Sequence, residues 1–166
     1  MKSNPRSGEE EYAAITRPTG SIRYMVPSIF LFTSSDLYHW EDHGILIEGT
    51  EKGHVGVNTP PIELENGWLI IYHQHRHRDD GEREYIVSLK LFNRDISRLL
   101  KEADVFMDPH MDAQKKGIVD NVVFPGAAIL HEDERLFVYA GGADRVTTVH
   151  IYKLNNIMDF LKPVRV

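Results

Sequence analysis

Two stretches of the sequence place residues that could contact a ligand at the ends of strand-like runs. The first, Gly53 to His73, reads GHVGVNTPPIELENGWLIIYH, and the second, Gly117 to Asp144, reads GIVDNVVFPGAAILHEDERLFVYAGGAD. Each sets a run of Gly, Asn, Thr or Pro against a segment rich in aromatic and β-branched residues, which favour strands. Each also ends in a polar residue. This layout is typical of a binding site built on strand ends.

Three alternating histidines, His73, His75 and His77, raise the separate question of a metal site. On a strand their side chains share one face, but successive ones lie about 6 to 7 Å apart, which is too far for three ligands of one tetrahedral ion. Arg76 and Arg78 stand beside them, next to an Asp-Asp-Gly turn, as expected of a solvated hairpin tip. We therefore predict neither a metal ion nor another cofactor at this position.

The composition is that of an ordinary globular protein of 166 residues, 42% of them hydrophobic and 27% charged. This length suits one domain. The formal net charge of −6 lacks the surplus of Lys and Arg that nucleic acid or anionic lipid requires, so neither is an expected partner. The chain has no cysteine, which excludes disulfides, thiolate catalysis and Cys-ligated zinc. Because it lacks an apolar signal core and any window of about 18 apolar residues, we expect a cytoplasmic protein that does not enter a membrane.

The elements that would position the polar residues are short β-strands. Residues 1–11 are polar and are predicted to form a flexible segment, and residues 12–166 a folded domain. Two turn signals, Asp79-Asp80-Gly81 and Glu132-Asp133-Glu134, predict hairpins between paired runs. Helices are predicted only at Asp95–Ala103 and Asn156–Leu161. The predicted strands are Ser28–Thr33, Trp68–Gln74, Glu84–Phe92, Asn121–Leu130, Leu136–Tyr139 and Thr147–Leu154.

A repeat of about 60 residues connects these strands. The segments IFLFTSSDLYHW, SLKLFNRDISRLL and VHIYKLNNIMDFL each run from an alternating strand to an Asp or Asn. The matching positions are Asp36, Asp95 and Asn156, which are 59 and 61 residues apart. Such a unit is typical of a β-propeller blade, although a simple meander of strands gives similar matches. The predicted fold is therefore all-β, with about three blades. Since propellers close with about four to eight blades, the others would come from a longer protein or a partner chain.

Five motifs, in order along the chain, resemble the C-terminal part of glycoside hydrolase family 130: YAAITRP, SSDLYHW, GVNTPPIELENGWLIIYH, GIVDNVVFPGAAI and LFVYAGGAD. The match runs from Tyr12 to Leu161. The family comprises β-mannoside phosphorylases and β-mannosidases, and the resemblance implies part of a five-bladed β-propeller that processes β-mannoside oligosaccharides. It also implies inorganic phosphate as a co-substrate of the phosphorylases and no other cofactor. A homo-oligomer or a complementing propeller chain would supply the remaining blades.

The resemblance implies binding roles for four residues. Asp144 matches a family aspartate that hydrogen-bonds sugar hydroxyls, and a carboxylate can accept two of them; the alternative is that it caps the tight turn before it. Phe124 matches an apolar wall of the sugar site, although packing in the core is the more common use of a strand phenylalanine. His73 and Arg17 match residues that hold phosphate; the alternatives are a strand-end histidine with local partners and a surface ion pair.

Two departures from the family bear on catalysis. His54 stands where the family has a lysine, and the family's general acid, an aspartate of an earlier blade, has no match in this sequence. That acid protonates the leaving oxygen while phosphate or water attacks with inversion. Glu63 could be proposed as a substitute, but its place at a strand start favours a solvated edge charge. We therefore predict no catalytic residue here. We expect either the C-terminal half of a β-mannoside-processing enzyme or a non-catalytic module that binds sugar or oligomerises.

Overall fold

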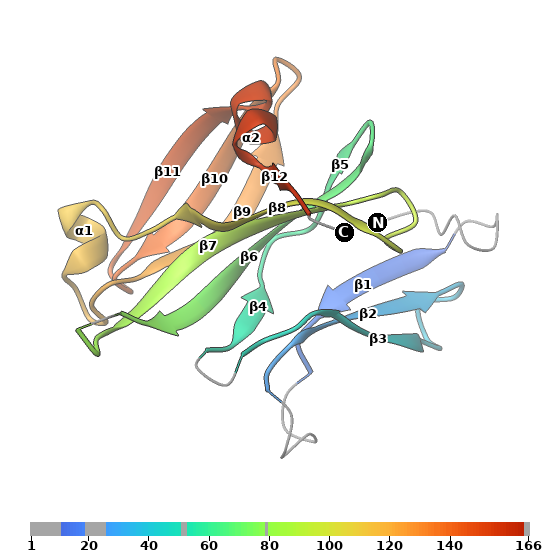
Figure 1. Ribbon diagram of the computed structural model, residues 1–166, viewed down its shortest axis with the longest axis horizontal. Coiled ribbons are helices and arrows are strands. Elements are labelled where there is room, and N and C mark those ends of the chain that lie inside the picture. The colour runs from blue at the N-terminus through green and yellow to red at the C-terminus, as the bar shows by residue number, and fades with distance from the viewer. Residues whose placement is uncertain (1–10, 19–25, 51–52, 79, 165–166) are drawn as a thin grey trace. The chain divides into compact units, whose positions relative to one another are not determined.

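The computed structural model describes residues 11–18, 26–50, 53–78 and 80–164. These residues form twelve strands and two short helices (Figure 1), so the mostly β composition predicted from the sequence is confirmed. The chain divides into two compact units, Met1–Val57 and Asn58–Val166. The N-terminal segment predicted to be flexible, residues 1–11, lies outside the described residues except for Glu11. No helix of the described residues is long and apolar enough to cross a membrane.

The first unit contains a three-stranded antiparallel sheet in the order β1-β2-β3. Its strands are β1 (Tyr12–Thr16), β2 (Ile29–Ser34) and β3 (Glu41–Ile47), and a short strand, β4 (Val55–Val57), ends the unit. β2 is buried along nearly its whole length, because its sequence, IFLFTS, is mostly apolar and it pairs with a strand on each side. The largely exposed β3 begins with two acidic residues that face solvent.

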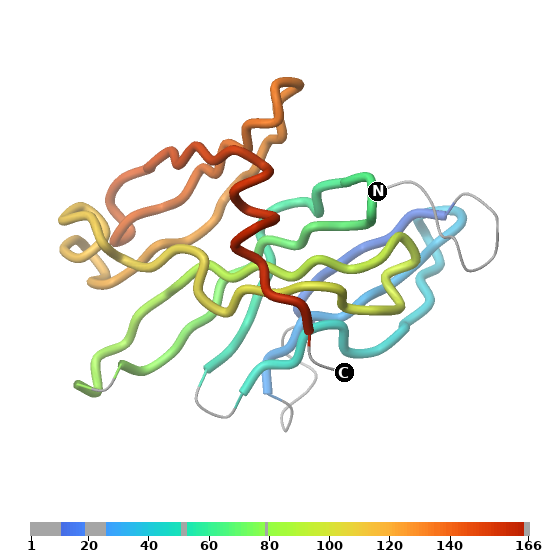
Figure 2. Tube along the Cα trace, turned by 45° about the horizontal axis from the view of Figure 1, so that its top comes forward, coloured from blue at the N-terminus to red at the C-terminus, as the bar shows by residue number. Residues whose placement is uncertain are grey.

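The second unit contains two sheets and both helices. The bounds of its elements are β5 (Ile62–Leu64), β6 (Gly67–His77), β7 (Arg83–Phe92), β8 (Leu99–Met107), α1 (Asp112–Lys115), β9 (Val123–Leu130), β10 (Arg135–Gly142), β11 (Val146–Lys153), α2 (Leu154–Phe160) and β12 (Lys162–Pro163). Within this unit the larger sheet has the order β12-β8-β7-β6, with β5 also pairing with β6, and the smaller sheet has the order β11-β10-β9. Figure 2 shows the chain leaving β11 through α2 to reach β12, which pairs with β8 of the larger sheet.

One apolar core joins the two sheets of the second unit. Alternate positions of β6, β7, β9 and β10 contribute aliphatic side chains to it, and α2 adds Ile157, which is 1% exposed. Burying each such side chain stabilises the fold by about 1.5 to 3 kcal/mol relative to leaving it in water. The core therefore fixes the strands that carry the candidate site. Its fully buried members include Leu69, Ile71, Val87, Leu89, Val123, Leu136 and Val138.

All six strands predicted from alternation are present, and no boundary is shifted by more than three residues. The predicted helix at Asn156–Leu161 is confirmed as α2. Both predicted hairpins form: the β9–β10 turn is closed by a hydrogen bond from the His131 N–H to the Arg135 carbonyl oxygen (2.9 Å), and the β6–β7 turn by one from the Arg78 N–H to the Glu82 carbonyl oxygen (2.8 Å). Asp79 of the second turn lies outside the described residues.

The predicted helix at Asp95–Ala103 is wrong. Its second half belongs to β8, and its first half is a turn held by local side-chain bonds. The Asn93 side-chain oxygen accepts the Arg98 N–H (2.9 Å), and an Asp95 carboxylate oxygen accepts the Ser97 N–H (3.1 Å). Short polar side chains of this kind compete with helical hydrogen bonds. The β7–β8 pairing then takes up the apolar residues that suggested a helix.

The repeat read from the sequence is visible in the backbone of its first two copies. Asp36 and Asp95 each follow a strand and accept backbone N–H groups two residues on. The next residue in each copy has a left-handed backbone, with φ 67° at Leu37 and 55° at Ile96. Each turn then leads into an antiparallel partner strand. The third copy differs, because Asn156 lies within α2.

Candidate functional site

An aromatic cluster lies where β6 ends and β9 begins. It consists of His73 and His75 of β6, Tyr85 of β7 and Phe124 of β9. The His73 and Phe124 rings are 4.3 Å apart between centroids, and the Tyr85 ring lies 6.1 Å from each of them. The His75 ring is 5.0 Å from that of Tyr85. The structure therefore brings together two residues to which the sequence analysis assigned binding roles, His73 for phosphate and Phe124 for sugar.

The cluster is assembled by strand pairing across the two sheets. The β6–β7 register sets His75 opposite Tyr85. The Tyr85 N–H donates to the Asn121 carbonyl oxygen (2.9 Å), and Tyr85 forms a parallel bridge with Val122. These contacts attach β7 to the segment that enters β9, and so bring Phe124 against His73. Figure 1 shows β6 and β10 ending, and β7 and β9 beginning, on the same side of this unit.

Phe124 is half-buried, and its cross-strand neighbour carries no side chain. The β9–β10 register pairs it with Gly141, so β10 places nothing opposite the ring. A Cβ built at Gly141 would lie 3.8 Å from the Phe124 carbonyl oxygen, an ordinary contact distance. A flat aromatic surface at a strand end suits the C–H face of a pyranose ring.

Asp144 lies in the turn between β10 and β11, at the end of the smaller sheet where β9 begins. The Arg145 N–H donates to the Gly142 carbonyl oxygen (3.0 Å), and Ala143 and Asp144 both have left-handed backbones, with φ 49° and 53°. Such conformations cost non-glycine residues about 1 kcal/mol or more each and persist only where neighbouring structure enforces them. The Asp144 side chain is exposed, and its carboxylate can accept two hydroxyl hydrogen bonds.

Arg17 belongs to the first unit, just beyond β1. Its guanidinium Nη1 donates to the Val55 carbonyl oxygen (3.5 Å), so this side chain reaches the strand that ends the unit. Its assignment to phosphate binding stays a prediction. The same holds for the proposed roles of His73, Phe124 and Asp144.

Burial decreases along the three alternating histidines. The side chain of His73 is buried, that of His75 is half-buried and that of His77 is exposed. Burial lowers the pKa of His75, and repulsion from His77 and Arg83 lowers it further. A neutral imidazole at this position can pack against aromatic rings without the cost of a buried charge. Among the described residues, no group of three or more His, Asp or Glu side chains is arranged to hold a metal ion.

We expect His75 and His39 to titrate on opposite sides of the ordinary histidine pKa of about 6.5. The hydrogen bond and attraction from Asp36 raise the pKa of His39. His39 therefore contributes stability below about pH 6.5 that is lost as pH rises through its folded pKa, whereas His75 contributes stability above about pH 6.5 that is lost as pH falls. An NMR titration of the imidazole protons measures both pKa values. Asp36→Asn should return the pKa of His39 to about 6.5 and leave the pKa of His75 unchanged. A shift of both pKa values would contradict the assignment of Asp36 as the cause for His39 alone.

Sequence reasoning missed several residues of this region. Tyr85 and Asn121 gave no signal of their own, because their roles depend on a long-range contact between β7 and the residues just before β9. Gln114 was also missed, although it stands three residues after Met111 at the start of a helical turn. Gln at this position often bonds back to the backbone at the helix start, and here the Met111 N–H donates to the Gln114 side-chain oxygen (3.2 Å).

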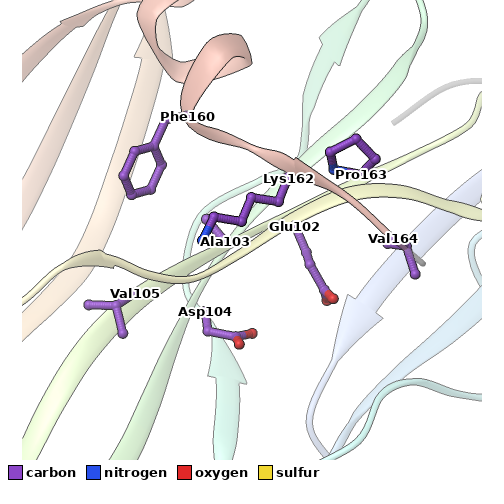
Figure 3. A pocket seen from close by; sticks show the side chains of 8 residues that line it. All are labelled: Glu102, Ala103, Asp104, Val105, Phe160, Lys162, Pro163 and Val164. Atoms are coloured by element: carbon purple, nitrogen blue, oxygen red, sulfur yellow. The ribbon is translucent and has the colours of Figure 1, made fainter.

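A groove of about 610 Å³ lies elsewhere on the second unit, along β8 and the C-terminal segment. Figure 3 shows the Phe160 ring, the Lys162 side chain and the acidic side chains of β8 around it. Glu102 in its wall is paired with Lys90. The groove contains none of the predicted site residues. It is lined by Glu102, Ala103, Asp104, Val105, Phe160, Lys162, Pro163 and Val164.

Comparison with known proteins confirms the resemblance to the mannoside phosphorylase family. A family model described as beta-1,4-mannooligosaccharide phosphorylase matches residues 4–163. The chain is 32% identical over 137 residues to the 1,2-beta-oligomannan phosphorylase of Thermoanaerobacter sp. strain X514, covering 79% of this chain and 45% of that protein. It is 26% identical over 164 residues to the beta-1,4-mannooligosaccharide phosphorylase of Ruminococcus albus, covering 95% of this chain and 49% of that one.

The fold is also similar to that of a solved structure. The beta-1,2-mannobiose phosphorylase from Listeria innocua, in complex with beta-1,2-mannobiose, superposes with a TM-score of 0.77 at 29% identity, over 91% of this chain and 43% of that chain. The chain therefore spans less than half of the length of each of these three relatives.

Proposed function

The chain belongs to the beta-1,4-mannooligosaccharide phosphorylase family, glycoside hydrolase family 130, and from this premise we propose that it binds a β-mannoside beside the aromatic cluster. The observation that supports this most directly is the 4.3 Å approach of the His73 and Phe124 rings. Phe124 would pack against the C–H face of the sugar, and Asp144 would accept its hydroxyl hydrogen bonds. Where phosphate is the acceptor, His73 would contact it, and the family resemblance assigns a phosphate-binding role to Arg17 of the first unit as well.

We further propose that the three sheets are blades of a five-bladed propeller. The β1-β2-β3 sheet, the larger sheet and the smaller sheet would each be one blade. In the complete propeller, phosphate or water would attack the anomeric carbon with inversion while a general acid from another blade protonates the leaving oxygen. The chain would then be the C-terminal half of an inverting β-mannoside phosphorylase or β-mannosidase.

An exposed apolar face on the smaller sheet supports the need for further blades. Tyr139 pairs with Val149, and Phe137 pairs with both Ile151 and Ile129, so these side chains share one face. Ile129 and Ile151 are each 54% exposed. A further sheet of the same fold would bury them, whether it comes from the same longer protein or from a complementing chain. The same observation favours a second candidate function, a sugar-binding module that oligomerises without turning substrate over.

Replacing Asp144 with alanine is expected to weaken β-mannoside binding by about tenfold, because a charge-assisted hydrogen bond contributes about 1.5 to 3 kcal/mol. Isothermal titration of the chain with β-1,2- and β-1,4-mannobiose measures the effect. Asp159→Ala is the matched control, since Asp159 is an exposed carboxylate on α2. Equal affinities of Asp144→Ala and the unaltered chain would exclude Asp144 as a sugar contact.

When the same samples are incubated with phosphate, we expect little or no release of mannose 1-phosphate. Rapid release would contradict the need for further blades.

A further inference from the structure

Gln114 is a polar side chain that is 0% exposed, although it belongs to α1, a single helical turn in the loop between β8 and β9. Burying an amide is costly unless its hydrogen bonds are replaced. Here the side-chain oxygen accepts the backbone N–H groups of His110 (3.3 Å) and Met111 (3.2 Å). These two bonds close the helical turn on itself. The loop therefore keeps its own shape through this carboxamide.

The amide nitrogen of Gln114 connects the same turn to β11. It lies 3.2 Å from His150 Nε2 and 3.5 Å from Thr148 Oγ1. Thr148 in turn donates to the Ala140 carbonyl oxygen of β10 (3.1 Å). Burial lowers the pKa of His150, and the nearby His110 lowers it further. A neutral His150 can accept a hydrogen bond from the amide. One carboxamide thus bonds both the loop and the sheet beneath it.

The loop that Gln114 anchors holds the turn carrying Asp144. The Val122 N–H donates to the backbone carbonyl oxygen of Gln114 (2.9 Å), and the Ala143 N–H donates to the backbone carbonyl oxygen of Val122 (3.1 Å). The Ala143 carbonyl oxygen accepts the Ile118 N–H (2.9 Å). Both polar groups of the Ala143 peptide are therefore fixed by the loop, and its side chain is fully buried. Figure 1 shows α1 at the end of the smaller sheet where β10 turns into β11.

This arrangement explains how two left-handed residues persist side by side. Neither Ala143 nor Asp144 is a glycine, so the left-handed backbone of each is strained and needs support from neighbouring residues. The loop supplies that support through hydrogen bonds, and the carboxamide of Gln114 holds the loop in place.

We propose that Gln114 is the positioning residue of the sugar site, which it serves by locking the α1 loop onto β11 and thereby fixing the turn that carries Asp144. This inference rests on the proposed β-mannoside site for its functional half. Its structural half concerns only the turn and can be tested without a ligand.

The test compares Gln114→Met with Gln74→Met in the full chain. Methionine keeps the length of the side chain and removes its hydrogen bonds, and Gln74 is a matched control because its amide also bridges strands, donating to Ser88 Oγ (2.7 Å). In Gln114→Met, exchange of the Ile118, Val122 and Ala143 amide hydrogens is expected to quicken about tenfold or more. In Gln74→Met these amides should exchange at the original rate. β-Mannobiose affinity should fall about tenfold in Gln114→Met only.

Gln114→Glu supplies a spectroscopic signature that a merely structural role would not move. A carboxylate at this position still accepts the His110 and Met111 N–H groups and attracts a proton onto His150. The pKa of His150, measured by NMR, should therefore rise in Gln114→Glu, and protection of the Ala143 amide should recover as His150 becomes charged. Gln114→Glu also serves as the test variant if Gln114→Met does not fold by circular dichroism.

Unchanged exchange of the three amides in Gln114→Met, or in Gln114→Glu at a pH where His150 is neutral, would overturn the inference. Faster exchange with unchanged mannobiose affinity would overturn its functional half, because the turn would then be free to move without affecting the sugar. If the unaltered chain binds no β-mannoside, the proposed function fails instead, and the exchange and pKa results still decide whether Gln114 fixes the turn.

Discussion

Gly67→Ala is expected to destabilise the protein by about 3 kcal/mol or more, at the upper end of single substitutions. Gly67 begins β6 with φ 146°, which L side chains rarely adopt, and a Cβ at this position would lie 1.9 Å from the Phe92 carbonyl oxygen. That atom is backbone, so the clash cannot be relieved by rotating a side chain. The β6–β7 pairing would have to shift at the start of the strand that carries His73.

Urea unfolding followed by the fluorescence of buried Trp68 measures this loss. Gly81→Ala is the matched control, since Gly81 also has a left-handed backbone (φ 84°) but nothing lies within 4 Å of its added Cβ. In Gly81→Ala the free energy of unfolding should fall by only about 1 kcal/mol, which is the cost of a left-handed backbone at alanine. Equal unfolding midpoints for the two variants would show that the close approach at Gly67 is relieved without cost.

Gly117→Ala is expected to disrupt the Asp144 turn while leaving the core of the second unit folded. A Cβ at Gly117 would lie 2.3 Å from the Ala143 carbonyl oxygen and 2.6 Å from the Ala143 Cβ. The α1 loop and the turn must therefore separate, which breaks the bond from the Ile118 N–H to the Ala143 oxygen. We expect β-mannobiose affinity to fall by about tenfold or more, because the Asp144 carboxylate that is proposed to contact the sugar would lose its position.

Titration with mannobiose and hydrogen exchange at Ala143 together measure this second effect. Gly126→Ala provides the comparison, because its Cβ would make only an ordinary contact, 3.7 Å from the Tyr139 carbonyl oxygen. If Gly117→Ala binds mannobiose as tightly as Gly126→Ala does, the turn is not held by the loop in the way described. Loss of cooperative unfolding would instead show that the loop supports the core itself.

Local patterns predicted six of the twelve strands that the described residues form. Alternation in Glu84–Phe92 and Leu136–Tyr139 reflects burial on one or both faces of a sheet, and burial is decided by side-chain type. The predicted helix at Asp95–Ala103 failed for a physical reason as well. Its apolar spacing suits either a helix or a strand, and the choice depends on whether a partner strand lies alongside.

The candidate site was predictable only in part. Asp144 could be placed at a strand end because Gly141 and Gly142 mark the turn before it. The contact between His73 and Phe124 could not be predicted from spacing, because it depends on the bridge from Tyr85 to Val122 between two sheets. No local pattern reports such a long-range pairing.

By itself, the sequence determined the mostly β composition, six of the twelve strands of the described residues, the family and the four residues proposed to bind sugar or phosphate. These follow from side-chain type and order along the chain. Only the tertiary structure decided which of those residues meet, and that the α1 loop supports the Asp144 turn through Gln114. The reason is that these features arise from hydrogen bonds between segments far apart in the chain, such as the one between Gln114 and His150.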